Sequence, residues 1–172
     1  MWPGTIHGAA MAFSSSSADA MNDVERFLAH AIQLERDAAR RYEELAAAMQ
    51  TDGNAELKAF FSRMARFSRL HLAQAVARGG FRELPVLRPE DYDWPEGTSP
   101  ETAEWMGVDA QMDAGDALRL ALDSEHRGHA YYAAIAATTQ DAELCALAGE
   151  FAAEEAQHVM ELERIIASRT AA

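Results

Sequence analysis

The stretch FAAEEAQHVMELE, residues 151–163, combines the pattern of a protein core with two groups that a core normally excludes. Its apolar residues recur at steps of three and four, which is the period of an amphipathic helix. Glu155 and His158 fall on the same face as those apolar residues, one turn apart. A buried carboxylate without a partner is very costly, so a core that contains one must also compensate its charge. The stretch therefore predicts a helix whose buried face carries a functional group.

Three further segments of the chain show the same helical period. The four predicted helices span about residues 21–50, 54–78, 113–139 and 141–168. The turn sequence TDGN follows the first helix, Gly79 and Gly80 stop the second, and Asp141 is a plausible N-cap for the fourth. The composition, rich in Ala, Glu, Leu and Arg, favours helix throughout.

The connections between these helices differ in length, and that difference predicts the topology. Short turns join the first helix to the second and the third to the fourth, so each pair should form an antiparallel hairpin. The stretch at about residues 79–112 contains several prolines and cannot be one helix, although residues 99–106 could form a short one. Two hairpins joined by one long crossover make an all-α, ferritin-like four-helix bundle.

The buried face of each predicted helix is apolar except near its middle. Glu35 lies there on the first helix, His71 on the second, Glu125 on the third, and Glu155 with His158 on the fourth. Three buried carboxylates repel one another, and these faces contain no Arg or Lys to pair with them. The charge of these carboxylates must then be compensated by protonation or by bound cations. Because oxygen ligands with a few imidazoles suit iron or manganese, the pattern indicates a site for two divalent metal ions.

Each of these positions also has a plainer interpretation when it is taken alone. Glu35 or Glu125 could be a boundary residue whose carboxylate reaches solvent, and His71 could be a hydrogen-bonded core histidine. Tyr42 and Tyr132, each seven residues after a Glu of the buried face, are candidate catalytic groups or core residues with a polar hydroxyl. The convergence of several such residues at one level of a bundle favours the metal site.

The overall composition limits the classes of partner. The chain has 172 residues and a formal charge of −13, from 15 basic and 28 acidic residues. This balance argues against a nucleic-acid or anionic-membrane partner, which would need a basic face. No apolar run reaches the length of a transmembrane helix. Residues 1–20 lack the basic start of a secretory signal. We expect them to be a flexible tail before a single domain at 21–170, in a cytoplasmic protein.

Some reactive side chains have no place on the predicted buried faces. The single cysteine, Cys145, excludes an intrachain disulfide and a four-thiolate iron site, and it is expected to be a buried small apolar residue. His7, His30 and His126 are expected to be solvated.

The two halves of the sequence are related to each other. LERDAARRYEELAA from Leu34 aligns with SEHRGHAYYAAIAA from Ser124, and MARFSRLH at 64–71 aligns with FAAEEAQH at 151–158. A repeated hairpin implies a pseudo-twofold axis with equivalent ligands from each half around a central site.

These features together resemble the ferritin-like domain of the rubrerythrin family, over roughly residues 22–168. The resemblance implies a homodimer with a diiron carboxylate site and peroxide or dioxygen chemistry. It implies that Glu35 and Glu125 are terminal ligands, that Glu155 bridges the metals, and that His158 and His71 are imidazole ligands. Two iron ions are expected, one is possible, and manganese or zinc are alternatives.

The sequence departs from the family pattern at three points. Ser68 replaces the bridging carboxylate expected three residues before His71. The additional Glu expected one turn after Glu125 is absent, and that turn offers Gly128 and His129, of which His129 could supply an imidazole. There is no rubredoxin-like domain, so an enzyme would need an external electron donor such as a rubredoxin-like protein. The predictions are therefore a diiron peroxidase or oxidase, a protein that holds metal without turnover, or a structural bundle with a decayed site.

Overall fold

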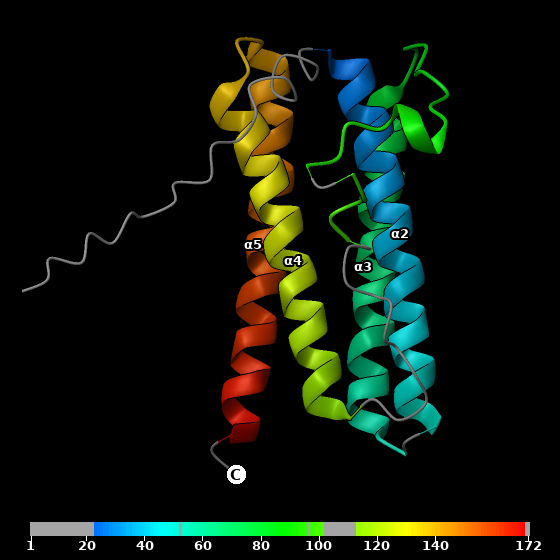
Figure 1. The fold of residues 1–172 in the computed structure, drawn as a ribbon, viewed down its shortest axis with the longest axis vertical. Helices are drawn as coiled ribbons and strands as arrows, with labels where there is room; N and C mark the ends of the chain where they lie inside the picture. Colours follow the sequence, from blue (N-terminus) through cyan, green and yellow to red (C-terminus); the bar gives the residue numbers. More distant parts are fainter. Residues whose placement is uncertain (1–22, 52, 96, 102–112, 171–172) are drawn as a thin grey trace, which may run out of the picture.

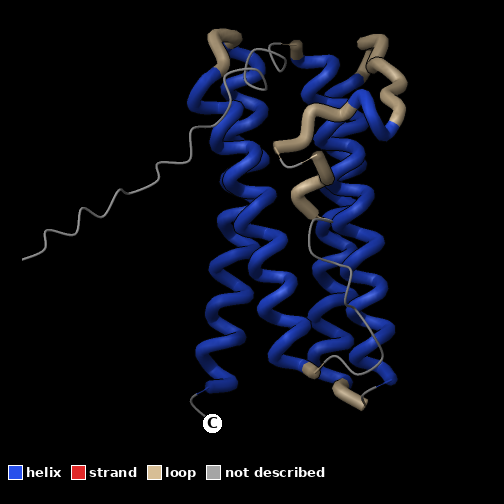
Figure 2. Tube along the Cα trace, viewed as in Figure 1, coloured by secondary structure: helices blue, strands red, loops and turns tan. Residues whose placement is uncertain are grey.

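The computed structural model describes residues 23–51, 53–95, 97–101 and 113–170, and these form helices and loops without strands (Figure 2). The elements are α2 (Val24–Thr51), α3 (Ala55–Gly79), the short 3-10 helix η1 (Pro89–Asp91), α4 (Ala114–Thr138) and α5 (Ala142–Thr170). The long helices fall close to the predicted segments. No described helix is long and apolar enough to span a membrane. The predicted tail, 1–20, and most of the predicted short helix at 99–106 lie outside the described residues.

The long helices pair as two antiparallel hairpins, α2 with α3 and α4 with α5 (Figure 1). Helix α3 ends at the top of the view and α4 begins at the bottom, so the segment between them has to travel the length of the bundle (Figure 1). We call this segment the crossover; its described residues are 80–95 and 97–101. The predicted all-α, ferritin-like bundle of two hairpins and one long crossover is confirmed.

Side chains at the helix ends explain why the helices begin and stop where they do. Asn54, Asp113 and Asp141 each accept a hydrogen bond from a backbone N–H of the first turn, at 3.1, 2.8 and 2.8 Å. These bonds satisfy donors that a helix start leaves without partners, and the last of them confirms the predicted cap at Asp141. Gly80 ends α3 with φ of +48°, a conformation that L side chains rarely adopt.

The interior of the bundle contains two apolar clusters, one toward each end, and every long helix contributes to both. The first is built around Phe27, Tyr132 and Phe151, with Tyr132 and Phe151 stacked at 5.1 Å between ring centres. The second is built around Tyr42 and Phe61, stacked at 6.2 Å. Each long helix has one set of residues in the first cluster and another set in the second. The predicted polar positions lie between these two sets. We call this level, between the clusters, the polar layer.

His30 corrects one prediction and shows how the crossover is attached. It was expected to be solvated, but it is fully buried on α2. Its Nε2 accepts a hydrogen bond from the backbone N–H of Asp93 at 3.0 Å, so Nδ1 carries the proton and donates to the carbonyl of Arg26 at 2.8 Å. The rings of Tyr92 and Trp94 meet it edge-on. The prediction failed because helical period alone does not reveal which outer face the crossover covers.

Cys145 corrects a second prediction. It was expected to be buried, but it is exposed, with its Sγ 3.3 Å from the carbonyl oxygen of Ala136. Leu144 takes the inward position in the first turn of α5. The next residue is rotated by about 100° around the helix axis and so faces outward.

Candidate metal centre

The polar layer contains four buried carboxylates, each from a different element. Glu35 on α2 is 1% exposed, Glu125 on α4 is 2% exposed and Glu155 on α5 is 3% exposed. The fourth is Glu101 of the crossover, which is 2% exposed. The alternative in which Glu35 or Glu125 reaches solvent does not describe this structure.

Glu125 lies at the centre of the polar contacts. Tyr42 donates a hydrogen bond to its Oε1, and Nδ1 of His158 lies 3.1 Å from its Oε2. The same nitrogen lies 3.6 Å from Oε2 of Glu155. One potential ligand atom from each of Glu125, Glu155 and His158 lies within 4.8 Å of the other two. Two ligands about 2.1 Å from one metal ion lie about 3–4 Å apart, and the separations of 3.1 and 3.6 Å from Nδ1 of His158 to the two carboxylates match that spacing.

Glu35 and His71 form a second group beside the first. Nδ1 of His71 lies 3.9 Å from Oε2 of Glu35, and its Nε2 lies 3.7 Å from Oε2 of Glu154. The rings of His71 and His158 stack with centres 5.4 Å apart. Oε1 of Glu35 is buried without a hydrogen-bond partner in the described chain. A buried carboxylate oxygen in that state is the kind of atom that a cation would satisfy.

The electrostatics of the layer show how its charge is compensated without a metal. Burial raises the pKa of Glu35 and Glu155 well above the usual value, and burial together with the charge of Glu125 raises the pKa of Glu101 to about 8. Burial also acts to raise the pKa of Glu125, but hydrogen bonds from Glu155, His158 and Tyr42 hold it lower. Its hydrogen bond to Glu125 raises the pKa of His158 against the effect of burial. The metal-free layer thus contains protonated carboxyls around one Glu125–His158 ion pair.

In the part of the chain that the structure describes, Arg and Lys provide little of this compensation. Among the described residues, none of the four buried carboxylates forms an ion pair with either residue type. Arg127 acts to lower the pKa of Glu101, but burial and Glu125 outweigh it. Protons are therefore the main counterweight in the metal-free protein, and divalent cations could displace them.

Two of the three departures in the sequence have structural counterparts. Ser68 is buried in the layer, and its Oγ lies 3.4 Å from the carbonyl of Met64, within its own helix. His129 is half-buried and lies outside the compact group around Glu125. A Cβ at Gly128 would lie 2.8 Å from Oε1 of Glu101. Glu101 was missed because it lies on the crossover, where helical period gives no guidance; the only sign of it was the vacant position at Gly128.

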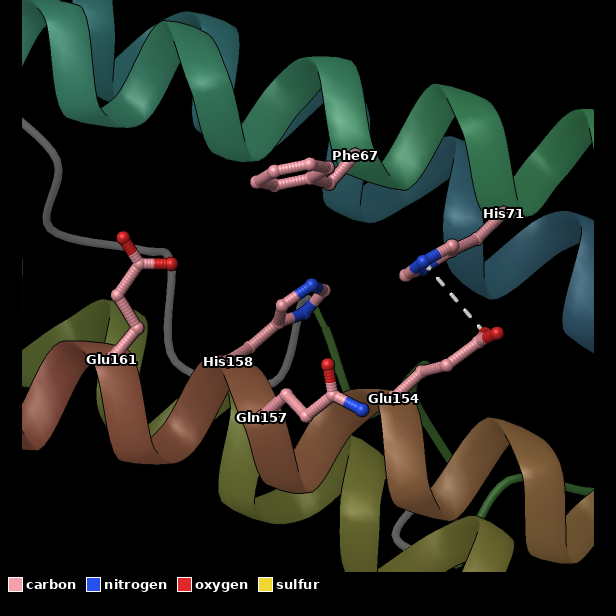
Figure 3. A pocket seen from close by; sticks show the side chains of 6 residues that line it. All are labelled: Phe67, His71, Glu154, Gln157, His158 and Glu161. Carbon is pink, nitrogen blue, oxygen red and sulfur yellow. Dashed lines mark ion pairs between the residues drawn. The ribbon is translucent and has the colours of Figure 1, made fainter.

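A pocket of about 230 Å³ lies between α3 and α5 beside the layer (Figure 3). Its lining includes both imidazoles, His71 and His158, together with Phe67 and Glu154. The side chain of Glu154 is 29% exposed and lies 3.7 Å from Nε2 of His71, so it connects the solvent with the partly buried imidazole of His71. The pocket is a route by which a small molecule could approach the layer.

Three comparisons relate the chain to known proteins. The model of the Rubrerythrin family matches residues 26–77, which span most of α2 and α3. A crystal structure of an uncharacterised conserved protein from Magnetospirillum magnetotacticum is 40% identical, with a TM-score of 0.71, over 85% of this chain and 95% of that one. A search of curated proteins finds no match.

The matched helices carry Glu35 and His71, and the structural relative extends the similarity to 85% of the chain. The chain therefore belongs to the rubrerythrin family and has its ferritin-like fold.

Proposed function

We propose that the polar layer binds two iron ions and that the protein reduces hydrogen peroxide, or dioxygen, at this centre. The observation that carries the proposal is the burial of four carboxylates and the His158 imidazole between two apolar clusters, with the His71 side chain beside them only 13% exposed. An oxygen-rich donor set with a few nitrogens suits iron or manganese better than zinc, which favours tetrahedral sites with more nitrogen or sulfur.

The residues fit such a centre in number and charge. Glu125, Glu155 and His158 would hold one ion, and Glu35 with His71 would hold the other. Two ferrous ions carry four positive charges, which matches the four carboxylates once their protons have left. When bound, the ferrous pair would supply the two electrons that cleavage of the O–O bond requires.

The tyrosines that border the layer, Tyr42 and Tyr132, would position and protonate the substrate. Burial, followed by the charge of Glu125, raises the pKa of Tyr42 well above its usual value, so its phenol keeps its proton and orients Glu125. Tyr132 also keeps its proton, because burial raises its pKa, and its hydroxyl has no hydrogen-bond partner in the described chain. That hydroxyl is available to donate to an oxygen of the substrate.

Two protons are needed to convert the oxygens of peroxide to water, and the pocket side of the layer can supply them. Glu154 is partly exposed, burial raises its pKa, and its carboxylate lies 3.7 Å from His71. We assign it the transfer of protons from solvent to the site. The electrons would come from an external donor such as a rubredoxin-like protein, and the functional unit would be a homodimer.

A second candidate function, metal holding without turnover, is favoured by Ser68. Its hydroxyl occupies the position where a bridging carboxylate is expected, so the α3 side of the layer offers one anionic ligand fewer. A centre with weaker ligation at one metal would bind iron without rapid redox cycling.

Oxidation kinetics separate the two functions. The protein would be loaded with Fe²⁺ without oxygen, desalted and mixed with peroxide while oxidation of the iron is followed by absorbance. A peroxidase should react within seconds and recover with a reductant. Tyr132→Phe should slow the reaction, whereas Glu163→Gln, at an exposed position of α5, should leave it unchanged. Metal that stays bound but reacts no faster than free Fe²⁺ would refute the enzyme and support the metal-holding protein.

A further inference from the structure

We infer that Glu101, on the crossover, is a metal ligand of this centre and takes the place of a carboxylate that α4 lacks at Gly128. The inference rests on the proposed metal centre and adds to it a ligand that comes from outside the four helices. It also makes binding of the metal and docking of the crossover depend on each other.

The position of Glu101 is fixed from two directions by α4. The hydroxyl of Ser124 donates a hydrogen bond to Oε2 of Glu101 and lies 3.4 Å from its carbonyl oxygen. The Nε of Arg127 donates to the carbonyl of Pro100 at 2.9 Å. The residues before and at Glu101 are thus anchored to the helix that carries Glu125, and the carboxyl is held inside the layer rather than at its edge.

The absence of a side chain at Gly128 makes room for this carboxyl. A Cβ at Gly128 would lie 2.8 Å from Oε1 of Glu101 and 3.6 Å from the carboxyl carbon of Glu155. The two carboxyls are therefore neighbours across the same vacant position. Glycine inside a helix is destabilising relative to alanine, so its presence in the middle of α4 needs a compensating reason. Admission of the Glu101 carboxyl is such a reason.

The Glu101 carboxyl has one oxygen held by the protein and one oxygen directed into the layer, where a metal ion could bind it. Ser124 occupies Oε2, which leaves Oε1 directed toward Gly128 and the Glu155 carboxyl. The Glu101 and Glu155 carboxyls lie on either side of the position that a Cβ at Gly128 would occupy, and both are buried in the polar layer with Glu125. A buried carboxyl that faces two others has no stabilising role in the metal-free protein, because it must stay protonated or repel them. A shared cation gives it a favourable partner.

Metal binding and docking of the crossover must strengthen each other by equal amounts of free energy. If a metal ion is bound by a crossover residue, then binding must stabilise the docked crossover by as much as docking strengthens binding. Metal should therefore slow backbone hydrogen exchange at residues 97–101, even though these residues lie on a loop.

The test compares three variants of the full chain. Glu101→Gln keeps the shape of the side chain and the bond from Ser124 but removes the anionic ligand. The double variant Glu101→Ala with Gly128→Glu vacates the space that a Cβ at residue 128 needs and supplies a carboxylate from α4 instead. His129→Ala is the matched control, since His129 is the alternative ligand from the same turn. Each protein is loaded with Fe²⁺ without oxygen, metal per chain is measured by mass spectrometry, and affinity by competition with a chelator.

We expect Glu101→Gln to bind at least about 10-fold more weakly or to lose one of two ions. We expect the double variant to recover binding and His129→Ala to match the unchanged protein. A thermal unfolding transition of metal-free Glu101→Gln at or above that of the unchanged protein would show that it still folds. Hydrogen exchange of the unchanged protein gives an independent reading, with slower exchange at 97–101 after metal addition.

Other outcomes overturn the inference. If the unchanged protein and Glu101→Gln bind metal equally, Glu101 is not a ligand, while the proposed metal centre stands. Loss of metal in His129→Ala but not in Glu101→Gln assigns the ligand to α4. Loss in Glu101→Gln without recovery in the double variant, or exchange at 97–101 that metal leaves unchanged, also contradicts it. An unchanged protein that binds no metal refutes the proposed function itself.

Discussion

Removal of the metal should make the stability of this protein fall as the pH rises above neutrality. The pKa of Glu101 is about 8 in the folded protein, against an ordinary value of 4.5. Between these values the folded protein keeps a proton that the unfolded chain has lost, so a rise in pH favours unfolding. Glu35, Glu155 and His158 have raised pKa values as well and act in the same direction.

The loss of unfolding free energy that Glu101 causes can be worked out in a pH range where the histidines with lowered pKa values do not oppose it. Burial lowers the pKa of His71 to about 4 and also lowers that of His30, and groups of this kind increase stability up to about pH 6.5. From pH 6.5 to 8, Glu101 alone should remove about 2 kcal/mol of unfolding free energy, at 1.36 kcal/mol per pH unit. For a domain of this size, that corresponds to a midpoint about 4–8 °C lower.

The assay is thermal or urea unfolding of chelator-treated protein at several pH values between 6.5 and 8. Glu101→Gln, which cannot ionise, should show a decline smaller by about 2 kcal/mol. Glu163→Gln removes a carboxylate at an exposed position of α5 and should retain the full decline. If Glu101→Gln declined as steeply as the unchanged protein, the assignment of Glu101 as a buried, protonated carboxyl would be wrong.

Three further substitutions test other parts of the account. Tyr42→Phe removes the hydrogen bond to Glu125 and should lower the unfolding free energy by about 1.5–3 kcal/mol in urea titrations. The control is Tyr131→Phe, because the Tyr131 hydroxyl has no partner among the described residues. This control should lower the unfolding free energy clearly less. Ser68→Glu should strengthen binding of the second ion at least about 10-fold in a chelator competition, and should destabilise the metal-free protein because it adds a carboxylate to the layer; unchanged affinity would mean that the site does not use this position. His30→Leu should leave the N–H of Asp93 without its acceptor and cost about 1–3 kcal/mol, with faster hydrogen exchange at that amide; protected exchange would show that His30 does not anchor the crossover.

The helices, and the carboxylates that they carry into the interior, could be predicted because both depend on local pattern. A seam with steps of three and four identifies which face of a helix is buried, and Glu35, Glu125 and Glu155 interrupt that seam at one level. Loop length then determines which helices are neighbours. Each of these inferences depends on residues that are close together in the sequence. Within a helix, the helical geometry fixes the relative direction of their side chains.

The parts that could not be predicted all involve the crossover or the outer helix faces. Glu101 and the partner of His30 both depend on where an irregular segment crosses the bundle, and no periodicity constrains that path. The exposure of Cys145 depended on which of two adjacent residues in the first turn of α5 faces inward. Gly128 is informative in retrospect, since an empty position on a seam next to carboxylates indicates that another group enters there.

The most direct test of the central claim is the number of metal ions per chain in protein loaded with Fe²⁺ and desalted, measured beside Glu155→Ala. Glu155 belongs to the compact ligand group with Glu125 and His158, so its loss should remove metal while Glu163→Ala should not. We predict two iron ions per chain in the unchanged protein and at most one, weakly held, in Glu155→Ala. Equal metal content in the two proteins, or none in either, would contradict the claim that the buried carboxylates are there to bind metal.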